Sequence, residues 1–389
     1  MITIFTPVYN RAVVLENLYQ SLWRQTDYDF EWLIIDDGST DSIAEVVCHW
    51  METESVPFPI RFYQQENGGK HRAINRGVQL AQGEAFFIVD SDDCLTEDAV
   101  EWIHKWWEDV ADNDGYAGIA GLRGNRIRDV IGDIPHFEVY ADATNLERSE
   151  YGLLGDKAEV YKTSVLRKEP FPEFEGENFL TEATVWDRIA YEGLKIRWFN
   201  QVIYLCEYRA DGLTSQGWEV FIKNPVGWGL YIRQKCLFYH LNAEERTEQY
   251  LEYYVFMRGR LSESQIQHNL GIQEEEFAKI KVHYEQCIEK TVSNIGRTFG
   301  MYGAGLRGKK ILEFYRGTKI RISFVLDQKK ADVPCRQIAL EGPYPKVDRI
   351  LITPKDGQSE IREFLTEQTD NKVIGYDEWK ECIGLGEIF

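Results

Sequence analysis

Three carboxylates crowd into four positions within FFIVDSDDCL, residues 86–95. Asp90, Asp92 and Asp93 directly follow four apolar residues, 86–89, which have the pattern of a buried strand. Like charges this close repel and raise one another's pKa unless a cation lies between them. A solvated acidic turn would also tolerate the crowding. The sharper interpretation is a site for a hard divalent cation, Mn²⁺ or Mg²⁺, because such cations bind carboxylate oxygens.

Three further clusters of polar residues each follow a short apolar segment nearer the N-terminus. Stretches with the apolar spacing of helices separate these segments, so strands and helices alternate along this part of the chain. The alternation predicts βαβ units and an α/β fold, with a mainly parallel sheet flanked by helices. In such sheets ligands bind outside the carboxyl ends of the strands. All four clusters are expected to meet at that edge, and they span residues 6–10, 36–41, 66–70 and 90–93.

The composition is that of a globular protein with an acidic balance. Hydrophobic residues make up 43% and charged residues 28% of the chain, which is ample material for a core. The net charge of −20 argues against nucleic acid as a partner, since phosphate backbones are bound by basic surfaces. The scattered cysteines contain no C-x-x-C pattern and predict reduced thiols. No secretion signal and no long apolar stretch is evident, so we expect a cytoplasmic protein.

The periodicity of the chain predicts three parts. Residues 1–215 carry the strand–helix alternation, with one or two antiparallel edge strands expected at 194–212. Residues 216–294 have helical spacing and form a helical connector, in which the SESQ segment at 262–265 matches a capping box. Residues 295–389 repeat the strand–helix alternation on a smaller scale.

The C-terminal part contains the glycine pattern of dinucleotide-binding folds. Gly303, Gly305 and Gly308 form G-x-G-x-x-G after a short strand, and Asp327 ends the next strand, where a ribose-binding acid belongs. This context predicts a small Rossmann-like α/β domain. The segment is long enough for only half of a dinucleotide cradle, so a docking role remains the alternative to nucleotide binding.

The four motifs TPVYNR, DDGSTD, NGGKHRAINRG and DSDD, in this order, resemble those of the inverting family 2 glycosyltransferases of GT-A fold. The resemblance covers about residues 1–215. It implies that a sugar is moved from a nucleotide-diphosphate donor, with a UDP-sugar favoured, to an acceptor hydroxyl, with Mn²⁺ or Mg²⁺ as cofactor. Segments 179–190 and 207–214 resemble the acceptor-side half of bacterial members that build surface polysaccharide or glycolipid. A saccharide or lipid-linked acceptor and peripheral contact with the inner face of the cell membrane are implied, and homo-oligomerisation stays open.

The resemblance assigns roles on the donor side of the site. Asp92 is implied as the most direct metal ligand, Asp90 as a ligand of ribose or metal-bound water, and Asp93 as a support for either. Asp37 is implied to accept the uracil N3–H, although DDGSTD can also be a turn in which Asp41 caps a helix. Thr6, Pro7 and Tyr9 are implied to lie behind the base and ribose, and Arg11 and Lys70 near the phosphates. Gly68 and Gly69 would allow close approach of the backbone. Asn75 is implied near the ribose, and Ser91 is a further implied donor-binding position.

Inversion requires a general base that takes the proton of the acceptor hydroxyl. The family carries a carboxylate for this role, often in an E-D pair, and this sequence departs from the pair. Glu182 is favoured because it precedes an apolar helical segment that would hold it firmly, whereas Glu177 and Asp187 remain alternatives. An acid favoured by the helix dipole is the plainer interpretation of Glu182. Trp186 and Asp211 are candidates for the acceptor site.

Other functions explain less of the sequence. A haloacid-dehalogenase-like phosphatase also has D-x-D after an apolar strand, but Cys94 stands where Thr or Val is expected, and three motifs are left unexplained. A calcium loop fails because Leu95 occupies the position that requires Gly. A non-catalytic sugar-nucleotide-binding scaffold is the remaining alternative. The spacing of Trp102, Trp106 and Trp107 favours core packing over a sugar-stacking face.

Overall fold

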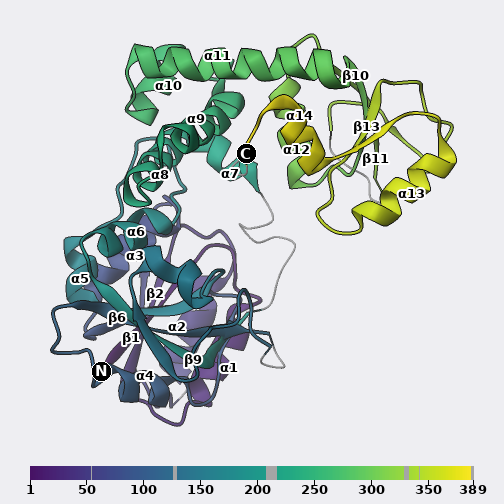
Figure 1. Cartoon of the computed structure of the whole chain (residues 1–389). Helices are drawn as coiled ribbons and strands as arrows, with labels where there is room; N and C mark the ends of the chain where they lie inside the picture. The colour runs from purple at the N-terminus through teal and green to yellow at the C-terminus, as the bar shows by residue number, and fades with distance from the viewer. Residues whose placement is uncertain (54, 126–128, 207–216, 328–332, 341, 387–389) are drawn as a thin grey trace. The chain divides into compact units, whose positions relative to one another are not determined.

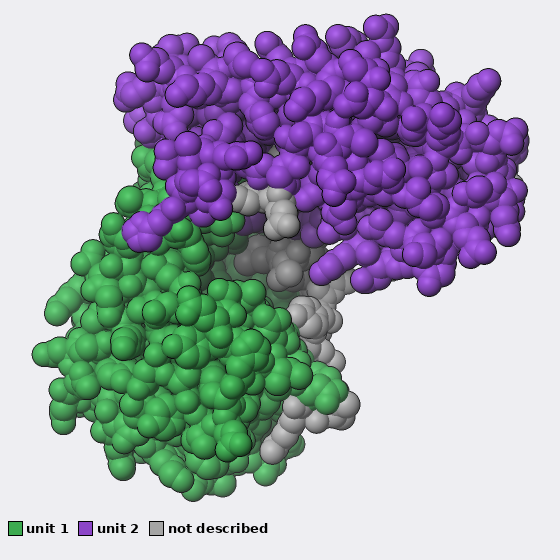
Figure 2. Space-filling model, in the orientation of Figure 1, with its two compact units in different colours: residues 1–216, 226–239 green, residues 217–225, 240–389 purple. Residues whose placement is uncertain are grey.

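The computed structural model describes most of the chain, namely residues 1–53, 55–125, 129–206, 217–327, 333–340 and 342–386. The chain divides into two compact units (Figure 2). Unit 1 comprises residues 1–216 and 226–239, and unit 2 comprises residues 217–225 and 240–389. The predicted helical segment 216–294 therefore contributes to both units, and the three-part division stays a prediction. The candidate site residues described below belong to unit 1.

Unit 1 is built on a nine-stranded sheet (Figure 1) in the order β3-β2-β1-β4-β8-β6-β9-β5, with β7 paired to β9. Its parallel half consists of β1 (Ile2–Val8), β2 (Phe30–Asp36), β3 (Ile60–Gln64) and β4 (Ala85–Ile88). Parallel strands end at the same edge of a sheet, so the four predicted clusters lie along one edge. The predicted α/β fold with a largely parallel sheet is confirmed.

The other half of the sheet is mixed. Here β8 (Lys157–Lys162) runs antiparallel to β4 and to β6 (Tyr116–Gly124), and β9 (Lys195–Leu205) runs parallel to β6. Two short strands, β5 (Cys94–Leu95) and β7 (Tyr140–Ala143), pair antiparallel with β9. The prediction of edge strands at 194–206 is wrong, because β9 lies inside the sheet. Its two faces are both buried, with Trp198 in one core cluster and Ile203 in the other.

Helices cover both faces of this sheet. One face packs against α1 (Leu15–Trp23), α2 (Ile43–Thr53) and α4 (Ala99–Trp107). The other packs against α3 (Lys70–Leu80), α5 (Thr163–Lys168) and α6 (Ala183–Tyr191). In α4 the buried Trp106 stacks on Phe199 with 4.2 Å between ring centroids, and Trp102 and Trp107 pack beside it. The core role predicted for these tryptophans is confirmed.

The remaining elements of unit 1 connect these layers. A 3₁₀ helix spans Asn145–Tyr151, and α8 (Pro225–Phe238) falls largely in unit 1. Unit 2 begins with helices α7 (Trp218–Lys223), α9 (Ala243–Met257), α10 (Glu263–Leu270) and α11 (Glu274–Lys290), followed by a π-helical turn over Thr291–Ile295. The predicted capping box is confirmed at α10, where Ser262 Oγ accepts from Gln265 N and Gln265 Oε1 accepts from Ser262 N. None of the helices in the described ranges combines the length and hydropathy of a membrane span.

Unit 2 also contains a five-stranded parallel sheet in the order β12-β11-β10-β13-β14. The strands are β10 (Thr298–Tyr302), β11 (Arg321–Leu326), β12 (Gln337–Ile338), β13 (Arg349–Ile352) and β14 (Val373–Gly375). They are accompanied by α12 (Leu306–Tyr315), α13 (Gln358–Gln368) and α14 (Tyr376–Ile383). The second parallel α/β sheet predicted for this part is present.

The glycine pattern of unit 2 lies between β10 and α12. Gly303 has φ +91°, and Gly308 packs so closely that a Cβ would lie 2.5 Å from the Gly303 carbonyl oxygen. Asp327 Oδ2 accepts from Ala304 N at 2.7 Å and so braces the same turn. These contacts explain the residue types through the local fold alone. The Rossmann-like assignment and ligand binding by this domain stay predictions.

Candidate active site

The sheet edge of unit 1 brings together three charged side chains from separate segments. Lys70 is the first residue of α3, Asp90 follows β4, and Glu182 precedes α6. The Lys70 ammonium lies 2.6 Å from Asp90 Oδ1 and 2.8 Å from Glu182 Oε1. One cation therefore bridges two of the carboxylates that the sequence singled out. Burial lowers the pKa of Lys70, whereas the charges of Asp90 and Glu182 raise it, and the net shift is upward.

A second cation, which the sequence interpretation missed, flanks Asp90. Arg123 in β6 places Nη1 3.7 Å from Asp90 Oδ2, and its guanidinium lies 4.2 Å from the centre of the Tyr204 ring. Burial raises the pKa of Asp90, but Lys70 and Arg123 outweigh it, so the carboxyl has a lowered pKa. The available signal was an arginine within the otherwise small and apolar segment 116–124. Its contact with Asp90 depends on strand pairing that no local pattern reveals.

The aspartates of the DSDD motif have different surroundings. Asp93 is buried and accepts the Tyr204 hydroxyl at 2.9 Å, while the same hydroxyl accepts from Asp90 N at 2.9 Å. Ser91 is buried as well. Asp92 is partly exposed, and its carboxylate has no hydrogen-bond or ion-pair partner within the described residues. Of the three carboxylates, Asp92 is therefore the most available to an added ligand.

The donor set at this motif suits a hard divalent cation. No group of three or more His, Cys, Asp or Glu side chains in the described part of the chain could hold a metal unaided. Asp92 and Asp90 nevertheless offer carboxylate oxygens at a partly exposed edge. Mg²⁺ in particular is usually held by one or two carboxylates together with substrate phosphates and water. The residues present fit that mode of binding and do not fit an all-protein metal cage.

Asp37 holds the loop that leads into α3. Its Oδ1 accepts from Gln65 Nε2 at 2.7 Å and Gly68 N at 3.0 Å, and its Oδ2 accepts from Gly69 N at 2.7 Å and Asn67 Nδ2 at 3.2 Å. The residue is only 4% exposed. Two acceptor sites on each oxygen are thus occupied. An approaching nucleobase N3–H would have to compete with these donors.

Gly69 is required at the start of α3 for two reasons. Its φ of +95° lies in a region that side chains rarely adopt, and a Cβ would lie 1.8 Å from the Asn178 carbonyl oxygen. The close backbone approach expected at this glycine is therefore made to the chain itself. It fixes where Lys70 begins the helix.

The other donor-side positions divide into exposed and buried groups. Tyr9 is 50% exposed and Arg11 is partly exposed beyond the end of β1, and Pro7, inside the strand, is partly exposed as well. Thr6 is buried, and its hydroxyl accepts a hydrogen bond from Trp32 Nε1 at 3.0 Å within the core. Asn75 exchanges hydrogen bonds with the backbone of Phe171 at 2.9 and 2.8 Å. Thr6 and Asn75 therefore have structural contacts that account for their side chains.

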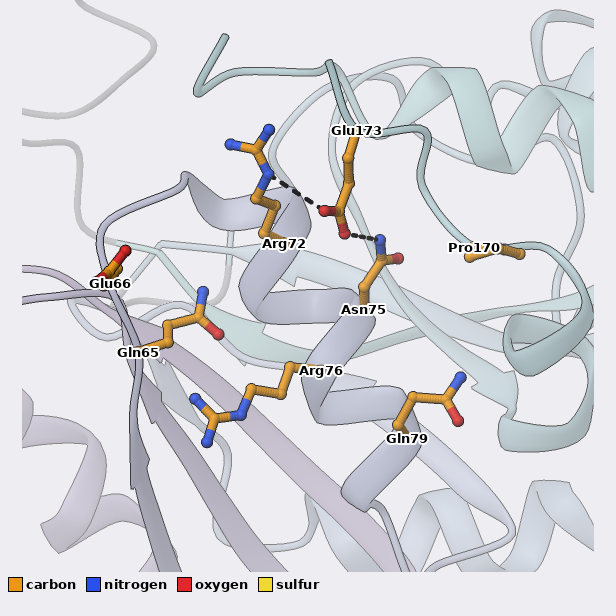
Figure 3. Close-up of a pocket in the computed structure, with 8 residues that line it drawn as sticks. All are labelled: Gln65, Glu66, Arg72, Asn75, Arg76, Gln79, Pro170 and Glu173. Carbon is orange, nitrogen blue, oxygen red and sulfur yellow. Dashed lines mark hydrogen bonds and ion pairs between the residues drawn. The ribbon is translucent and has the colours of Figure 1, made fainter. Parts of the chain in front are cut away.

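Asn75 also lines a polar groove along α3 (Figure 3). The groove encloses about 430 Å³, and its Glu173 accepts from Arg72 Nε at 3.3 Å and Asn75 Nδ2 at 2.8 Å. Three of its polar side chains, Arg72, Asn75 and Glu173, are thus bonded to one another. The groove does not include the Lys70 bridge, and its lining residues are Gln65, Glu66, Arg72, Asn75, Arg76, Gln79, Pro170 and Glu173.

The candidate general bases differ in their hydrogen bonds. Glu177 is buried and accepts from Val226 N at 2.6 Å and Gly227 N at 2.8 Å, so it caps the N-terminus of α8. Asp187 is buried and accepts from Asn145 Nδ2 at 2.6 Å, and burial raises its pKa. The Glu182 side chain is 33% exposed and makes no capping hydrogen bond to α6. Glu182 is thus the candidate whose carboxylate a substrate can reach.

The two further residues predicted for the acceptor site, Trp186 and Asp211, are not found as accessible groups among the described residues. Trp186 is buried and stacks on Tyr161 with 4.3 Å between ring centroids, which is core packing. Asp211, within segment 207–214, lies outside the described residues. Of the described residues predicted for the acceptor side, Glu182 is the one with a partly exposed carboxylate that makes no cap or core contact.

The N-terminal part of the chain belongs to a known family. Residues 3–134 match the family described as glycosyl transferase family 2. The match includes the motifs that follow β1, β2, β3 and β4. The chain therefore carries a domain of glycosyl transferase family 2, and the expected resemblance is confirmed. The phosphatase alternative gains no support from this match.

Curated relatives are similar over part of their length. Glycosyltransferase GlyG of Streptococcus pneumoniae is 34% identical over 106 residues, which cover 27% of this chain and 34% of GlyG. GlyA of the same species is 28% identical over 178 residues, 43% of this chain and 25% of GlyA. Hyaluronan synthase of Pasteurella multocida is 36% identical over 101 residues, 26% of this chain and 10% of the synthase. The matched segments thus span about a third or less of these relatives.

Solved structures resemble the chain at low identity. S. aureus TarS 1–349 in complex with UDP-GlcNAc is 16% identical with a TM-score of 0.49, over 80% of this chain and 89% of that one. Mannosyltransferase PcManGT from Pyrobaculum calidifontis in complex with GDP-Man and Mn²⁺ is 20% identical with a TM-score of 0.41, over 59% of this chain and 62% of that one.

Replacing Asp37 by asparagine should loosen the loop before α3. The amide would turn donors toward the Gly68 or Gly69 N–H, and hydrogen bonds to a charged acceptor contribute about 1.5–3 kcal/mol each. We expect Asp37→Asn to lower the free energy of unfolding by about 2–4 kcal/mol in urea titrations. The control Gln65→Ala removes one donor and should cost about 1 kcal/mol. Unchanged stability in Asp37→Asn, with loss of nucleotide binding alone, would contradict the loop-holding role.

His71 should make the fold sensitive to acid. It is buried in α3, its Nδ1 has no partner within the described residues, and burial together with Arg72 lowers its pKa from 6.5 to about 4. As the pH falls, His71 binds a proton in the unfolded state before it does so in the folded state. The free energy of unfolding is therefore unaffected by this group above pH 6.5 and decreases as the pH falls from 6.5 toward 4. The decline should reach about 3 kcal/mol. The free energy of unfolding, measured against pH for wild type and His71→Gln, should converge at low pH; parallel curves would refute this.

Proposed function

We propose that this chain is an inverting, metal-dependent glycosyltransferase that moves a sugar from a nucleotide-diphosphate sugar to an acceptor hydroxyl. One observation carries the proposal. In a family 2 domain, the accessible Glu182 shares the Lys70 bridge with Asp90, and Asp92, two positions after Asp90, has no hydrogen-bond or ion-pair partner among the described residues. The proposed base and the two carboxylates proposed to hold the metal thus lie at one sheet edge, as the proposed transfer reaction would require.

On the donor side, Asp92 and Asp90 would hold Mn²⁺ or Mg²⁺. The bound ion would neutralise charge that develops on the leaving diphosphate. Pro7 near the end of β1, and Tyr9 and Arg11 just after it, are partly or half exposed and are the chain's own groups proposed to contact base, ribose and phosphate. Asp37 is proposed to serve the donor through the Gly68–Gly69 loop that it holds.

On the acceptor side, Glu182 is proposed as the general base. Its carboxylate takes the proton of the acceptor hydroxyl while that oxygen forms a bond to the anomeric carbon. The bond from that carbon to the diphosphate oxygen breaks with its electron pair, so the nucleoside diphosphate leaves. Attack opposite the leaving group inverts the anomeric configuration. The support for this assignment is that Glu177 and Asp187 are buried and hydrogen-bonded elsewhere.

A uridine diphosphate sugar is the donor proposed for the first tests, and the acceptor is proposed to be a saccharide or a lipid-linked saccharide. Relatives named chondroitin synthase and hyaluronan synthase accord with a role in building bacterial polysaccharide or glycolipid. A cytoplasmic location, with contact at the inner face of the cell membrane, follows from the same proposal. Calorimetric titration of UDP, GDP and dTDP sugars in the presence of Mn²⁺ identifies the nucleotide.

Asp92→Ala should abolish both turnover and metal-dependent binding of UDP. The substitution removes a carboxylate that has no partner within the described part of the chain, and loss of charge stabilisation at the leaving group costs at least about 100-fold in rate. Titration of UDP with and without Mn²⁺ measures the binding. Asp112→Ala, at an exposed position after α4, is the matched control and should behave as wild type. Mn²⁺-dependent UDP binding by Asp92→Ala would overturn the metal assignment.

Glu182→Gln should abolish transfer but leave UDP binding within about twofold of wild type. Loss of a general base costs about 10²–10⁴ in rate, whereas the donor does not depend on that carboxylate. Sugar transfer and UDP affinity are measured on the same preparation. Glu177→Gln is the comparison, and it should lower stability through the α8 cap while the residual folded protein still transfers sugar. Normal transfer by Glu182→Gln would remove it from the mechanism.

A further inference from the structure

Lys70 has contacts that differ from those expected of a phosphate ligand. Its ammonium is within hydrogen-bond distance of Asp90 Oδ1 at 2.6 Å and Glu182 Oε1 at 2.8 Å. A lysine ammonium has three donors. Two of them are therefore directed at carboxylates of the protein, which requires an explanation in terms of those carboxylates.

The two carboxylates depend on Lys70 to different degrees. Asp90 has a second cation, Arg123, at 3.7 Å, and its backbone N–H donates to the Tyr204 hydroxyl at 2.9 Å. The Glu182 carboxylate has no other hydrogen-bond or ion-pair partner among the residues that the structure describes, and it does not cap its own helix. Removing Lys70 would therefore leave Asp90 supported and Glu182 without any anchor.

The position of Lys70 is itself fixed by the backbone. Asp37 accepts from the Gly68 and Gly69 N–H groups just before it, and Gly69 packs directly against the Asn178 carbonyl. Asn178 lies on the segment that leads to Glu182. The loop that presents the lysine and the segment that presents the base are thus packed against each other. This arrangement defines the distance between the ammonium and the Glu182 carboxylate.

We infer that Lys70 is a positioning residue for the base: its ion pair holds the Glu182 carboxylate in the orientation from which it meets the acceptor hydroxyl. This inference rests on the proposed function. When the donor binds at Asp90 and Asp92, Arg123 remains as the cation beside Asp90, and Lys70 keeps its bond to Glu182. The chemistry of a long side chain explains the need, because a free glutamate samples several rotamers and meets the acceptor only in a few of them.

The kinetic test uses Lys70→Met, which keeps the length of the side chain and removes the charge. At saturating UDP-sugar we expect kcat for transfer to fall about 100-fold, while the affinity for UDP with Mn²⁺ stays within about threefold of wild type. Lys70→Arg retains a cation and should recover to within about tenfold of wild type. The matched control Lys168→Met removes an exposed lysine of α5 and should have no effect. A tenfold or larger loss of UDP affinity in Lys70→Met, with kcat preserved, would assign Lys70 to the phosphates and overturn the inference.

A second readout does not require turnover. In a double-mutant cycle on urea unfolding, Lys70→Met and Glu182→Gln should be non-additive, since each removes the same ion pair. Additive effects would show that the bridge is not formed, whatever the enzyme does. If wild type transfers no sugar from any nucleotide donor but the cycle is non-additive, the proposed function fails and the ion pair stands. Sugar transfer by Lys70→Met at the wild-type rate would contradict the positioning role and leave the proposed function unaffected.

Discussion

The parallel pairing of β1 with both β2 and β4 is the constraint on which the candidate site depends. Its register places Val8 opposite Asp36, and Phe5 opposite Ile88. Because the strands run in one direction, the residues after each strand emerge at a single edge, although they are far apart in sequence. The apolar strand residues bury both faces of the sheet and so fix this register. Without it, the acidic and glycine-rich segments would be unrelated surface loops.

Crowded negative charge at that edge is balanced in three ways. Lys70 and Arg123 flank Asp90, the Tyr204 hydroxyl donates to Asp93, and two backbone N–H groups and two side-chain amides donate to Asp37. Each device lowers the cost of holding a carboxylate in a partly buried place. The exceptions are informative. Among the described residues Asp92 has no partner and Glu182 has only the lysine, which is why the proposal assigns the metal to Asp92 and the acceptor hydroxyl to Glu182.

Two glutamates near helix N-termini show that one residue type can either stabilise the fold or keep an accessible carboxylate. Glu177 and Glu182 lie five positions apart and are the same residue type. The former is fully used by the N-terminus of α8, a helix distant in sequence, whereas the latter stands at the start of α6 without a capping bond. The polar groove along α3 follows the same rule, since Arg72 and Arg76 there donate to backbone carbonyls and Glu173 accepts from Arg72 and Asn75. Chemical residue type alone therefore does not identify a reactive group.

The sequence by itself determined the alternation of strands and helices, the four clusters at the strand ends, the tryptophan core of α4 and the capping box at Ser262, because each depends on local spacing. The tertiary structure decided that β9 lies inside the sheet, that Arg123 reaches Asp90, and which carboxylates are occupied. The physical reason is that hydrogen bonds and ion pairs of these groups come from distant segments. Glu177 is satisfied by Val226, Asp187 by Asn145, and Glu182 by Lys70, and no local pattern contains those partners.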